Sequence, residues 1–322
     1  MCYDIRIKTM KAGQKINMKY LIIGAGGTGG VTGYYMKKAG KDVTLIARGE
    51  HLKKIQKQGL TLEKMWDKTE ENISIPATDM EHYAEHPDVI FVCVKTFSLD
   101  KALAALRPCV DEHTVVVPVM NGIDHADRTR AALPAGRVVN SLIYITSSYD
   151  GEYAICHASP YVRMRADSPD RDAAALVCRL LHHEQAMECT IPQDMKSEVW
   201  KKYIINCAYN TITAYYTCTT RGLLEHPERL AEFRFLLDEA YAVAIADGVQ
   251  LPSGLTAEIF EDMMHYRNAD ATSSMARDAM AHKPTELETF SGHLVRLADR
   301  LGVPAPVSKR FYQELLKREV GK

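Results

Sequence analysis

The sequence predicts a two-part chain, in which an α/β domain with a doubly wound parallel sheet is followed by an all-helical domain. Strand-like apolar runs alternate with helical patterns through the first half, which is typical of a parallel sheet covered by helices on both faces. Beyond residue 192 the patterns are helical, and prolines separate them. The chain has 322 residues, enough for two domains of the usual ~100–200 residues each.

The two domains are expected at residues 18–192 and 193–322. The first predicted strand follows directly on Met18, and the segment 1–17 lacks the apolar centre of a signal peptide. We therefore treat residues 1–17 as an N-terminal extension and assign them no function.

Composition narrows the class of protein. Hydrophobic residues make up 46% of the chain and charged residues 25%, as in ordinary globular proteins. The formal net charge of −1 gives no electrostatic case for binding nucleic acid or an anionic membrane surface. No apolar run approaches the ~18 residues of a membrane span. The eight cysteines include no C-x-x-C pair, so we expect free thiols, the reducing cytoplasm and no metal site.

A glycine-rich turn follows the first predicted strand, Tyr20 to Ile23, and precedes a predicted helix. In the segment GAGGTG, the first glycine permits the turn, the second lets a pyrophosphate approach the backbone, and the third lets helix pack on strand. The helix N-terminus then offers N–H groups and its dipole to a phosphate. We predict a Rossmann-type dinucleotide site here; the alternative is a purely structural turn. The predicted cofactor-binding residues are Gly24, Gly26, Gly27, Thr28 and Gly29.

The second predicted strand, Asp42 to Ala47, ends in a cation, Arg48. Sites specific for NAD usually carry an acidic residue here, which accepts hydrogen bonds from the ribose 2′-hydroxyl. A cation, with Lys53 and Lys54 shortly after, suits a 2′-phosphate instead. The sequence therefore favours NADPH over NADH. The alternative is that Arg48 merely starts the next helix on a solvated face.

Two further polar residues follow buried strands. Lys95 ends the apolar run that starts at Val89, and Asn121 follows the run from Val115 to Met120. Because ligands of parallel sheets bind at the carboxyl ends of the strands, Lys95 is a candidate for the cofactor's phosphates and Asn121 for the nicotinamide or the substrate. The alternatives are a lysine that reaches water and an asparagine that serves only the turn. Later segments between 137 and 164 are predicted to finish the sheet with antiparallel strands.

The densest polar pattern lies in a helix predicted from Met195 to Tyr216. Lys202, Asn206 and Asn210 are spaced by four residues, so they lie along one helical face. Asparagine lowers helix propensity, and a buried amide needs hydrogen-bond partners. This face is therefore expected to meet something polar. Alternatively, each amide satisfies a neighbouring helix end and Lys202 extends to water.

Several segments together resemble the ketopantoate reductase family, the NADPH-dependent 2-dehydropantoate 2-reductases. The resemblance runs from Met18 almost to the C-terminus. The matching segments, in the family's order, are GAGGTG at 24–29, LIARGEHL at 45–52, CVKTF at 93–97, MNGID at 120–124, EVWKKYIINCAYN at 198–210, SSM at 273–275 and PTELETFSGHLVRLADRLGVPAP at 284–306.

The resemblance implies a Rossmann domain followed by a helical domain like that of the 6-phosphogluconate dehydrogenase superfamily. By position, Lys202 matches the family's catalytic lysine and Glu286 the carboxylate beside the reacting hydroxyl. Asn206 and Asn210 match substrate-binding asparagines, and Ser274 the serine that holds the substrate's carboxylate end. From the pattern alone, Ser274 and Glu286 would be helix-capping residues.

The resemblance also supports the cofactor assignments. Arg48 and Lys95 match contacts to the adenosine phosphates of NADPH, and Asn121 matches an amide near the nicotinamide. The chain departs from the family at residues 210–214, where it has NTITA in place of Asn-Pro-Leu-Thr-Ala. The resemblance implies that these residues lie near the substrate rather than the cofactor.

The resulting expectation is an NADP-dependent oxidoreductase that reduces 2-dehydropantoate to pantoate in pantothenate and coenzyme A biosynthesis. Lys202 is expected to be the general acid, because the ketone oxygen gains negative charge as hydride arrives. The alternatives are another 2-keto or 3-hydroxy acid as substrate, or an NADPH-sensing protein without turnover. A homodimer is also open, since the aromatic side chains of Tyr215, Tyr216, Phe233 and Phe235 suit either pairing or core burial.

Overall fold

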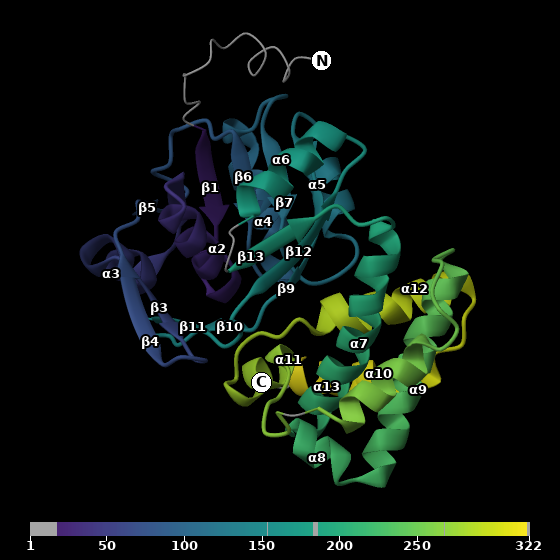
Figure 1. Cartoon of the computed structure of the whole chain (residues 1–322). Helices are drawn as coiled ribbons and strands as arrows, with labels where there is room; N and C mark the ends of the chain where they lie inside the picture. The colour runs from purple at the N-terminus through teal and green to yellow at the C-terminus, as the bar shows by residue number, and fades with distance from the viewer. Residues whose placement is uncertain (1–17, 153, 183–185, 267, 321–322) are drawn as a thin grey trace. The chain divides into compact units, whose positions relative to one another are not determined.

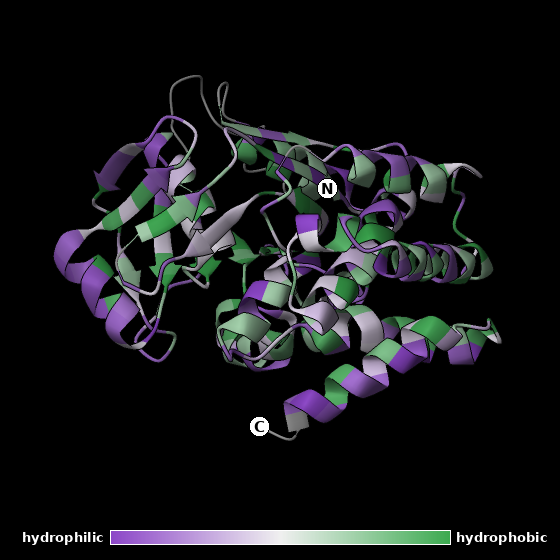
Figure 2. Cartoon of the chain, turned by 90° about the horizontal axis from the view of Figure 1, so that it is seen from below, coloured by the Kyte–Doolittle hydropathy of each residue, from purple (hydrophilic) through white to green (hydrophobic). Residues whose placement is uncertain are grey.

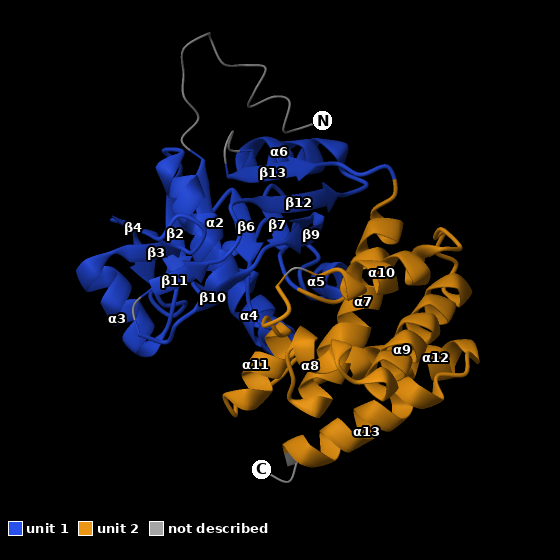
Figure 3. Ribbon diagram, turned by 60° about the horizontal axis from the view of Figure 1, so that its bottom comes forward, with its two compact units in different colours: residues 1–120, 124–193 blue, residues 121–123, 194–322 orange. Residues whose placement is uncertain are grey.

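The computed structural model describes residues 18–152, 154–182, 186–266 and 268–320 (Figure 1). The extension proposed at residues 1–17 lies outside this part of the chain. The chain divides into two compact units (Figure 3). Of the described residues, the sheet unit holds 18–120 and 124–193, and the helical unit holds 121–123 and 194–320. Residues 121–123, which the sequence analysis placed in the first domain, thus group with the helices.

A six-stranded sheet forms the centre of the sheet unit, in the order β5-β2-β1-β6-β7-β8. Each neighbouring pair is parallel. The strand order runs outward from β1 in both directions, which confirms the predicted doubly wound sheet. The strands are β1 (Lys19–Ile23), β2 (Asp42–Ile46), β5 (Ala77–Thr78), β6 (Val89–Val92), β7 (Val115–Pro118) and β8 (Arg137–Val138).

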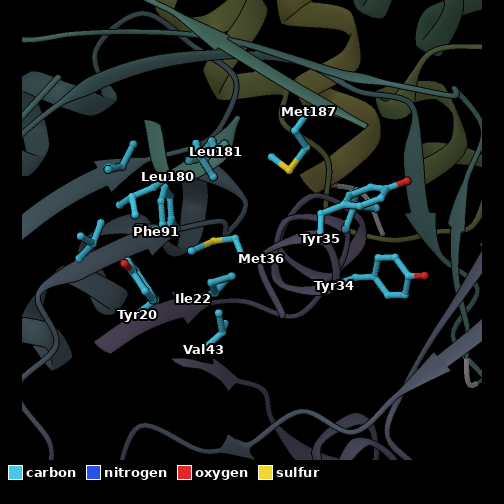
Figure 4. Packing of buried hydrophobic residues seen from close by; sticks show 14 of the residues in the cluster. Tyr20, Ile22, Tyr34, Tyr35, Met36, Val43, Phe91, Leu180, Leu181 and Met187 are labelled. Atoms are coloured by element: carbon cyan, nitrogen blue, oxygen red, sulfur yellow. The ribbon is translucent and has the colours of Figure 1, made fainter. Parts of the chain in front are cut away.

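Helices connect these strands, as the alternating pattern predicted. They are α2 (Gly27–Lys38), α3 (Gly49–Gln58), α4 (Leu99–Leu106) and α5 (His125–Ala132), with the 3₁₀ turns η1 (Thr96–Ser98) and η2 (Arg107–Cys109). A further helix of this unit, α6 (Arg171–Leu181), comes after the last strand of the six-stranded sheet. Successive side chains of a strand point to opposite faces of the sheet, and both faces are buried here. In β1, Ile22 belongs to one hydrophobic cluster and Leu21 to another. Figure 4 shows the first cluster, in which Met36 of α2 lies near Ile22 of β1.

Two smaller sheets accompany the main one, in the orders β10-β11-β3-β4 and β13-β12-β9. Segments between 137 and 164 do form antiparallel pairs, β10 with β11 and β9 with β12, but the prediction that they finish the main sheet is wrong. Of the described strands in that range, β8 alone joins the main sheet, in parallel, and β11 pairs with β3 in parallel. Local alternation cannot choose a strand's partner, because pairing depends on residues far apart in sequence. The strands are β3 (Leu60–Lys64), β4 (Thr69–Ile73), β9 (Asn140–Tyr144), β10 (Ser147–Tyr149), β11 (Ala154–His157), β12 (Val162–Asp167) and β13 (Met187–Thr190).

The helical unit has the predicted all-helical character. Its helices are α7 (Met195–Tyr216), α8 (Thr220–Leu224), α9 (Pro227–Ala246), α10 (Leu255–Met264), α11 (Ser274–Met280), α12 (His293–Leu301) and α13 (Pro306–Val320), and a π-helical turn, η3 (Glu288–Gly292), precedes α12. Hydrophobic and hydrophilic residues mix along the helices, including α13, the helix next to the label C (Figure 2). Each helix therefore has an apolar side for one shared core, to which Trp200 and Phe233 belong.

Helix α7 has the bounds that the sequence predicted, and it packs against α9 and α11. The Asp194 side chain caps its first turn by accepting a hydrogen bond from the Ser197 N–H at 3.1 Å. The helix ends at Tyr216, and the C-cap residue Thr217 adopts the left-handed conformation with φ of 51°. Within the described part of the chain, no helix combines the length and apolar character needed to cross a membrane.

Candidate functional site

Two of the glycines in the turn after β1 are required by the fold itself. Gly24 has φ of +96°, and a Cβ there would lie 2.6 Å from the Cys93 carbonyl oxygen. A Cβ on Gly29 would lie 1.9 Å from the Gly24 carbonyl oxygen, which is inside any van der Waals contact. The first and third glycines therefore allow α2 to begin directly against β1 and β6.

Gly26, the second glycine, differs from both. Its φ of −75° and ψ of −163° suit any residue, and a Cβ built on it meets nothing within 4 Å. The described chain thus gives no internal reason for glycine at this position, whereas close approach of a pyrophosphate does. Helix α2 begins at the next residue, Gly27, with no acidic side chain in its first turn and no side-chain cap. This N-terminus is suited to an anion.

Arg48 is the N-cap residue of α3, directly after β2. Its side chain is exposed, and no described residue forms an ion pair or a hydrogen bond with its guanidinium. The two lysines that follow are engaged, since Lys53 pairs with Glu50 at 2.7 Å and Lys54 donates to the Glu152 carbonyl. Of the cations predicted near a 2′-phosphate, Arg48 is the one left available among the described residues.

Lys95 lies just beyond β6 and is the N-cap residue of η1. Its side chain is partly buried. Because β2, β1 and β6 are adjacent parallel strands, Arg48, the glycine turn and Lys95 all follow the carboxyl edge of the same sheet. The structure thus brings together, on one edge, the residues that the sequence analysis assigned to the cofactor's phosphates.

Three polar side chains that are far apart in the sequence meet in the helical unit. The Asn121 amide donates from Nδ2 to Glu286 Oε2 at 3.3 Å, and Lys202 Nζ donates to Asn121 Oδ1 at 3.4 Å. The Asn121 amide therefore bridges the ammonium and the carboxylate. We call Asn121, Lys202 and Glu286 the polar cluster.

The environment of the polar cluster perturbs its lysine. Glu286 is only 3% exposed, and Lys202 is partly buried. Burial lowers the pKa of Lys202 from 10.5 to about 8, and the negative charge of Glu286 opposes that shift. A lysine with this pKa holds a proton at neutral pH and can release it, which is the property of a general acid.

Asn210 is buried, and its amide is already engaged within the helical unit. Its Oδ1 accepts hydrogen bonds from Ser274 Oγ at 3.3 Å and from the Met275 N–H at 3.2 Å, both at the start of α11. Its Nδ2 donates to the Asn206 carbonyl at 3.0 Å. The Asn210 amide thus satisfies a neighbouring helix end, which was the alternative interpretation of this residue. It also positions the Ser274 side chain.

Asn206 lies between Lys202 and Asn210 on the same face of α7. It is partly buried, and its side-chain amide forms no hydrogen bond with any described residue. Two donors and an acceptor are thus available one helical turn from Lys202.

A π-helical turn shapes the chain next to Glu286, and the sequence analysis did not foresee it. The chain is π-helical at Glu288–Gly292 and α-helical from His293. The Tyr203 hydroxyl on α7 donates to the Thr289 and Phe290 carbonyls, at 2.8 and 3.0 Å. Such turns recur at functional sites. Tyr203, next to Lys202, is a supporting residue that no sequence pattern indicated.

The described residues contain no group of histidine, cysteine, aspartate or glutamate side chains that could hold a metal ion. Of the aromatic residues considered for pairing, Phe233 is buried and the Tyr215 ring packs on Phe311 at 4.6 Å. Phe235 is 56% exposed. Core burial therefore explains most of this aromatic set.

Comparison with known proteins identifies the family to which the chain belongs. The family model described as ketopantoate reductase PanE/ApbA matches residues 20–167, and the model of its C-terminal domain matches residues 194–319. The chain belongs to the ketopantoate reductase family. This membership confirms the resemblance drawn from the motifs and the prediction of an oxidoreductase.

Individual relatives span nearly the whole chain. The uncharacterised oxidoreductase YkpB of Bacillus subtilis is 28% identical over 313 residues, which cover 95% of this chain and 100% of that protein. The crystal structure of a PanE/ApbA family ketopantoate reductase from Ralstonia eutropha JMP134 has a TM-score of 0.83 at 27% identity, covering 94% of this chain and 99% of that one. D-mandelate dehydrogenase, solved with NADH and anilino(oxo)acetate, has a TM-score of 0.84 at 19% identity, covering 94% and 99%, and shares the fold.

Proposed function

We propose that the protein reduces 2-dehydropantoate (ketopantoate) to pantoate with NADPH, in the biosynthesis of pantothenate and coenzyme A. The observation that carries the proposal is the polar cluster, in which an amide links a lysine of lowered pKa to a buried carboxylate. A protein that only senses NADPH has no need of such an acid. Membership of the ketopantoate reductase family supports the choice of substrate.

The residues at the carboxyl edge of the main sheet fit a nicotinamide dinucleotide. Gly26 leaves its backbone open to a pyrophosphate, and the N–H groups of Gly27 and Thr28 in the first turn of α2 would donate to it. Arg48 would bind the 2′-phosphate that distinguishes NADPH from NADH, with Lys95 as a second cation. Hydride is the chemistry that the nicotinamide supplies when it is bound.

Lys202 serves as the general acid. Reduction of the ketone carbon puts negative charge on its oxygen, and the Lys202 ammonium attracts that charge and transfers a proton to it. With a pKa of about 8, the ammonium is populated at neutral pH and still gives up its proton readily. The amine then regains a proton from water before the next turnover.

Asn121 and Glu286 hold the acid in position. Asn121 accepts from Lys202 while it donates to Glu286, so the amide sets the direction of the ammonium. The Glu286 carboxylate also raises the pKa of Lys202 against the effect of burial. Without that negative charge, a smaller fraction of Lys202 would carry a proton at the working pH.

Asn206 and Ser274 are the proposed direct contacts to the substrate. Asn206 has an amide that is not used by the described chain, one turn of α7 from the acid. Ser274, at the start of α11, is assigned to the carboxylate end of the substrate. Asn210 then acts as a positioning residue, because it accepts hydrogen bonds from the Ser274 hydroxyl and from the Met275 N–H in the first turn of α11.

Another 2-keto acid, or a 3-hydroxy acid, is the second candidate substrate. The segment NTITA at 210–214 departs from the family pattern within α7, which carries Asn206. The fold also serves a D-mandelate dehydrogenase, so the scaffold alone does not select ketopantoate. We propose the cytoplasm as the site of the reaction, because the described cysteines are free thiols.

The test is NADPH oxidation by the purified protein with ketopantoate and a panel of branched 2-keto acids, each repeated with NADH. We expect the highest kcat/KM with ketopantoate and NADPH. A higher kcat/KM for another acid would transfer the assignment to that acid. Tight NADPH binding without turnover of any panel member would favour the sensor.

A further inference from the structure

A pair of thiols in the sheet unit lies apart from every residue assigned above. Cys178 on α6 and Cys189 on β13 have their sulfur atoms 3.4 Å apart, and the Cys189 thiol donates to Cys178. Figures 1 and 3 both draw α6 beside β13. The two thiols are thus in direct contact, on two elements that pack together.

We propose that Cys178 and Cys189 form a peroxide-sensitive dithiol, which hydrogen peroxide converts into an intramolecular disulfide. A disulfide bond is about 2.05 Å long, so the two sulfurs need to approach by roughly 1.3 Å. A movement of this size is within the range of side-chain rotation. The proposal stands on this geometry and does not depend on the proposed substrate.

The surroundings of the two sulfurs assign them different roles. Cys178 is partly exposed, so peroxide can reach it, whereas Cys189 is buried. The hydrogen bond from Cys189 lowers the pKa of Cys178, and the positive charges of Arg179 and Arg165 act in the same direction against burial and Asp167. The pKa of Cys189 is raised. Cys178 is therefore the thiol that reacts first, and Cys189 resolves it.

The chemistry balances with one molecule of peroxide. The Cys178 thiolate attacks one peroxide oxygen and the O–O bond breaks, which leaves a sulfenic acid on Cys178 and releases hydroxide, protonated to water. The Cys189 sulfur then attacks the Cys178 sulfur, the S–O bond breaks, and the hydroxyl leaves as a second water with the Cys189 proton. Two thiols are oxidised to one disulfide, and the peroxide is reduced to two waters.

Cys156 is a matched control within the same unit. It is also partly exposed, but its thiol donates to Glu63 Oε2 at 3.3 Å. Burial and the Glu63 carboxylate raise its pKa to about 11. Exposure alone would make the two cysteines equally reactive, whereas the thiol–thiol contact predicts that Cys178 reacts on the order of tenfold faster or more.

The experiment exposes the full-length reduced protein to hydrogen peroxide, alkylates the remaining thiols under denaturing conditions, and maps the peptides by mass spectrometry. We expect Cys178 and Cys189 to lose their thiols together, to appear as one linked pair, and to recover with dithiothreitol. Cys156→Ser should behave like the wild type. In Cys189→Ser, dimedone should trap a sulfenic acid on Cys178. In Cys178→Ser, Cys189 should stay reduced.

Several results would overturn the proposal. One is that Cys178 and Cys189 remain alkylatable when Cys156 has already been oxidised. Another is a link between either cysteine and a different partner, or between two chains. A third is that Cys189 is oxidised at the wild-type rate in Cys178→Ser. Since the single serine substitutions remove only one sulfur each, far-UV circular dichroism provides the check that each variant is folded.

Discussion

The glycine turn of the sheet unit and the polar cluster of the helical unit are built in opposite ways. The turn is made by six consecutive residues, and backbone conformation and close approach determine it. The polar cluster joins residues 121, 202 and 286, and side-chain hydrogen bonds in a buried setting determine it. The comparison teaches that substitutions in the turn should separate folding from cofactor binding, whereas substitutions in the cluster should change chemistry and its pH dependence.

The largest expected effect is on chemistry, in Lys202→Ala. Loss of the general acid should lower kcat by about 10²–10⁴-fold, while the dissociation constant of NADPH stays near that of the wild type. Steady-state kinetics and cofactor fluorescence measure the two quantities. The control is Lys201→Ala, because Lys201 precedes the acid on the same helix but pairs with Glu198 at 2.8 Å. Equal losses in the two variants would contradict the assignment.

The glycines of the turn offer a matched pair of substitutions to alanine. Gly29→Ala puts a Cβ 1.9 Å from the Gly24 carbonyl oxygen, and we expect the free energy of unfolding to fall by about 1–3 kcal/mol or more. Gly26→Ala meets nothing within 4 Å. It should keep wild-type stability and weaken NADPH binding on the order of tenfold. Denaturant unfolding and fluorescence titration test both. A Gly26→Ala protein as unstable as Gly29→Ala would mean that the glycine serves the fold.

The two units should also differ in their pH dependence: the stability of the sheet unit should change at acid pH, whereas the activity that depends on Lys202 should change at alkaline pH. His157 on β11 is fully buried, neither ring nitrogen has a hydrogen-bond partner among the described residues, and burial with the Lys64 charge lowers its pKa from 6.5 to about 4. Between pH 6.5 and 4, the His157 side chain is therefore protonated in the unfolded chain but mostly neutral in the folded chain. Stability should fall as the pH drops from 6.5 to 4, by up to about 3 kcal/mol.

His157→Phe tests this expectation. Phenylalanine fits the aromatic surroundings, since Tyr35 and Trp66 make edge contacts with the His157 ring. The substitution should flatten the acid limb of a plot of unfolding free energy against pH, while exposed His113→Gln leaves it unchanged. An acid limb that persists in His157→Phe would assign the effect to other groups.

A smaller effect is expected from substitution of Arg48, the cation that follows β2. Arg48→Gln removes the exposed guanidinium after β2 and should raise the KM for NADPH on the order of tenfold, with little change for NADH. Lys53→Gln is the control, because Lys53 already pairs with Glu50. Equal changes for both cofactors would argue that Arg48 does not read the 2′-phosphate.

The sequence predicted what local pattern determines. The Gly24 to Gly29 spacing, the parallel strands and the bounds of α7 follow from glycine stereochemistry and from periodicity. The stripe of Lys202, Asn206 and Asn210 was visible for the same reason. The pattern could not tell that Asn210 is occupied by α11, because that depends on which helix end packs against it.

The remainder of the candidate site depends on tertiary contacts. Family resemblance supplied Glu286, but its link to Lys202 through Asn121 consists of hydrogen bonds between residues 165 and 81 positions apart. Likewise, Tyr203 supports a π-helical turn that no periodicity indicates. Side chains of this kind become functional only when the fold has assembled them.

The most direct test of the account is the pH dependence of ketopantoate reduction, compared between the wild type and Glu286→Gln. The reaction needs protonated Lys202, so kcat should fall as the pH rises through about 8. Because the Glu286 charge raises the pKa of Lys202, its removal should move that alkaline limb to lower pH. A wild-type profile that stays flat well above that pH, or a limb that does not move in Glu286→Gln, would contradict the role of Lys202 as the proton donor.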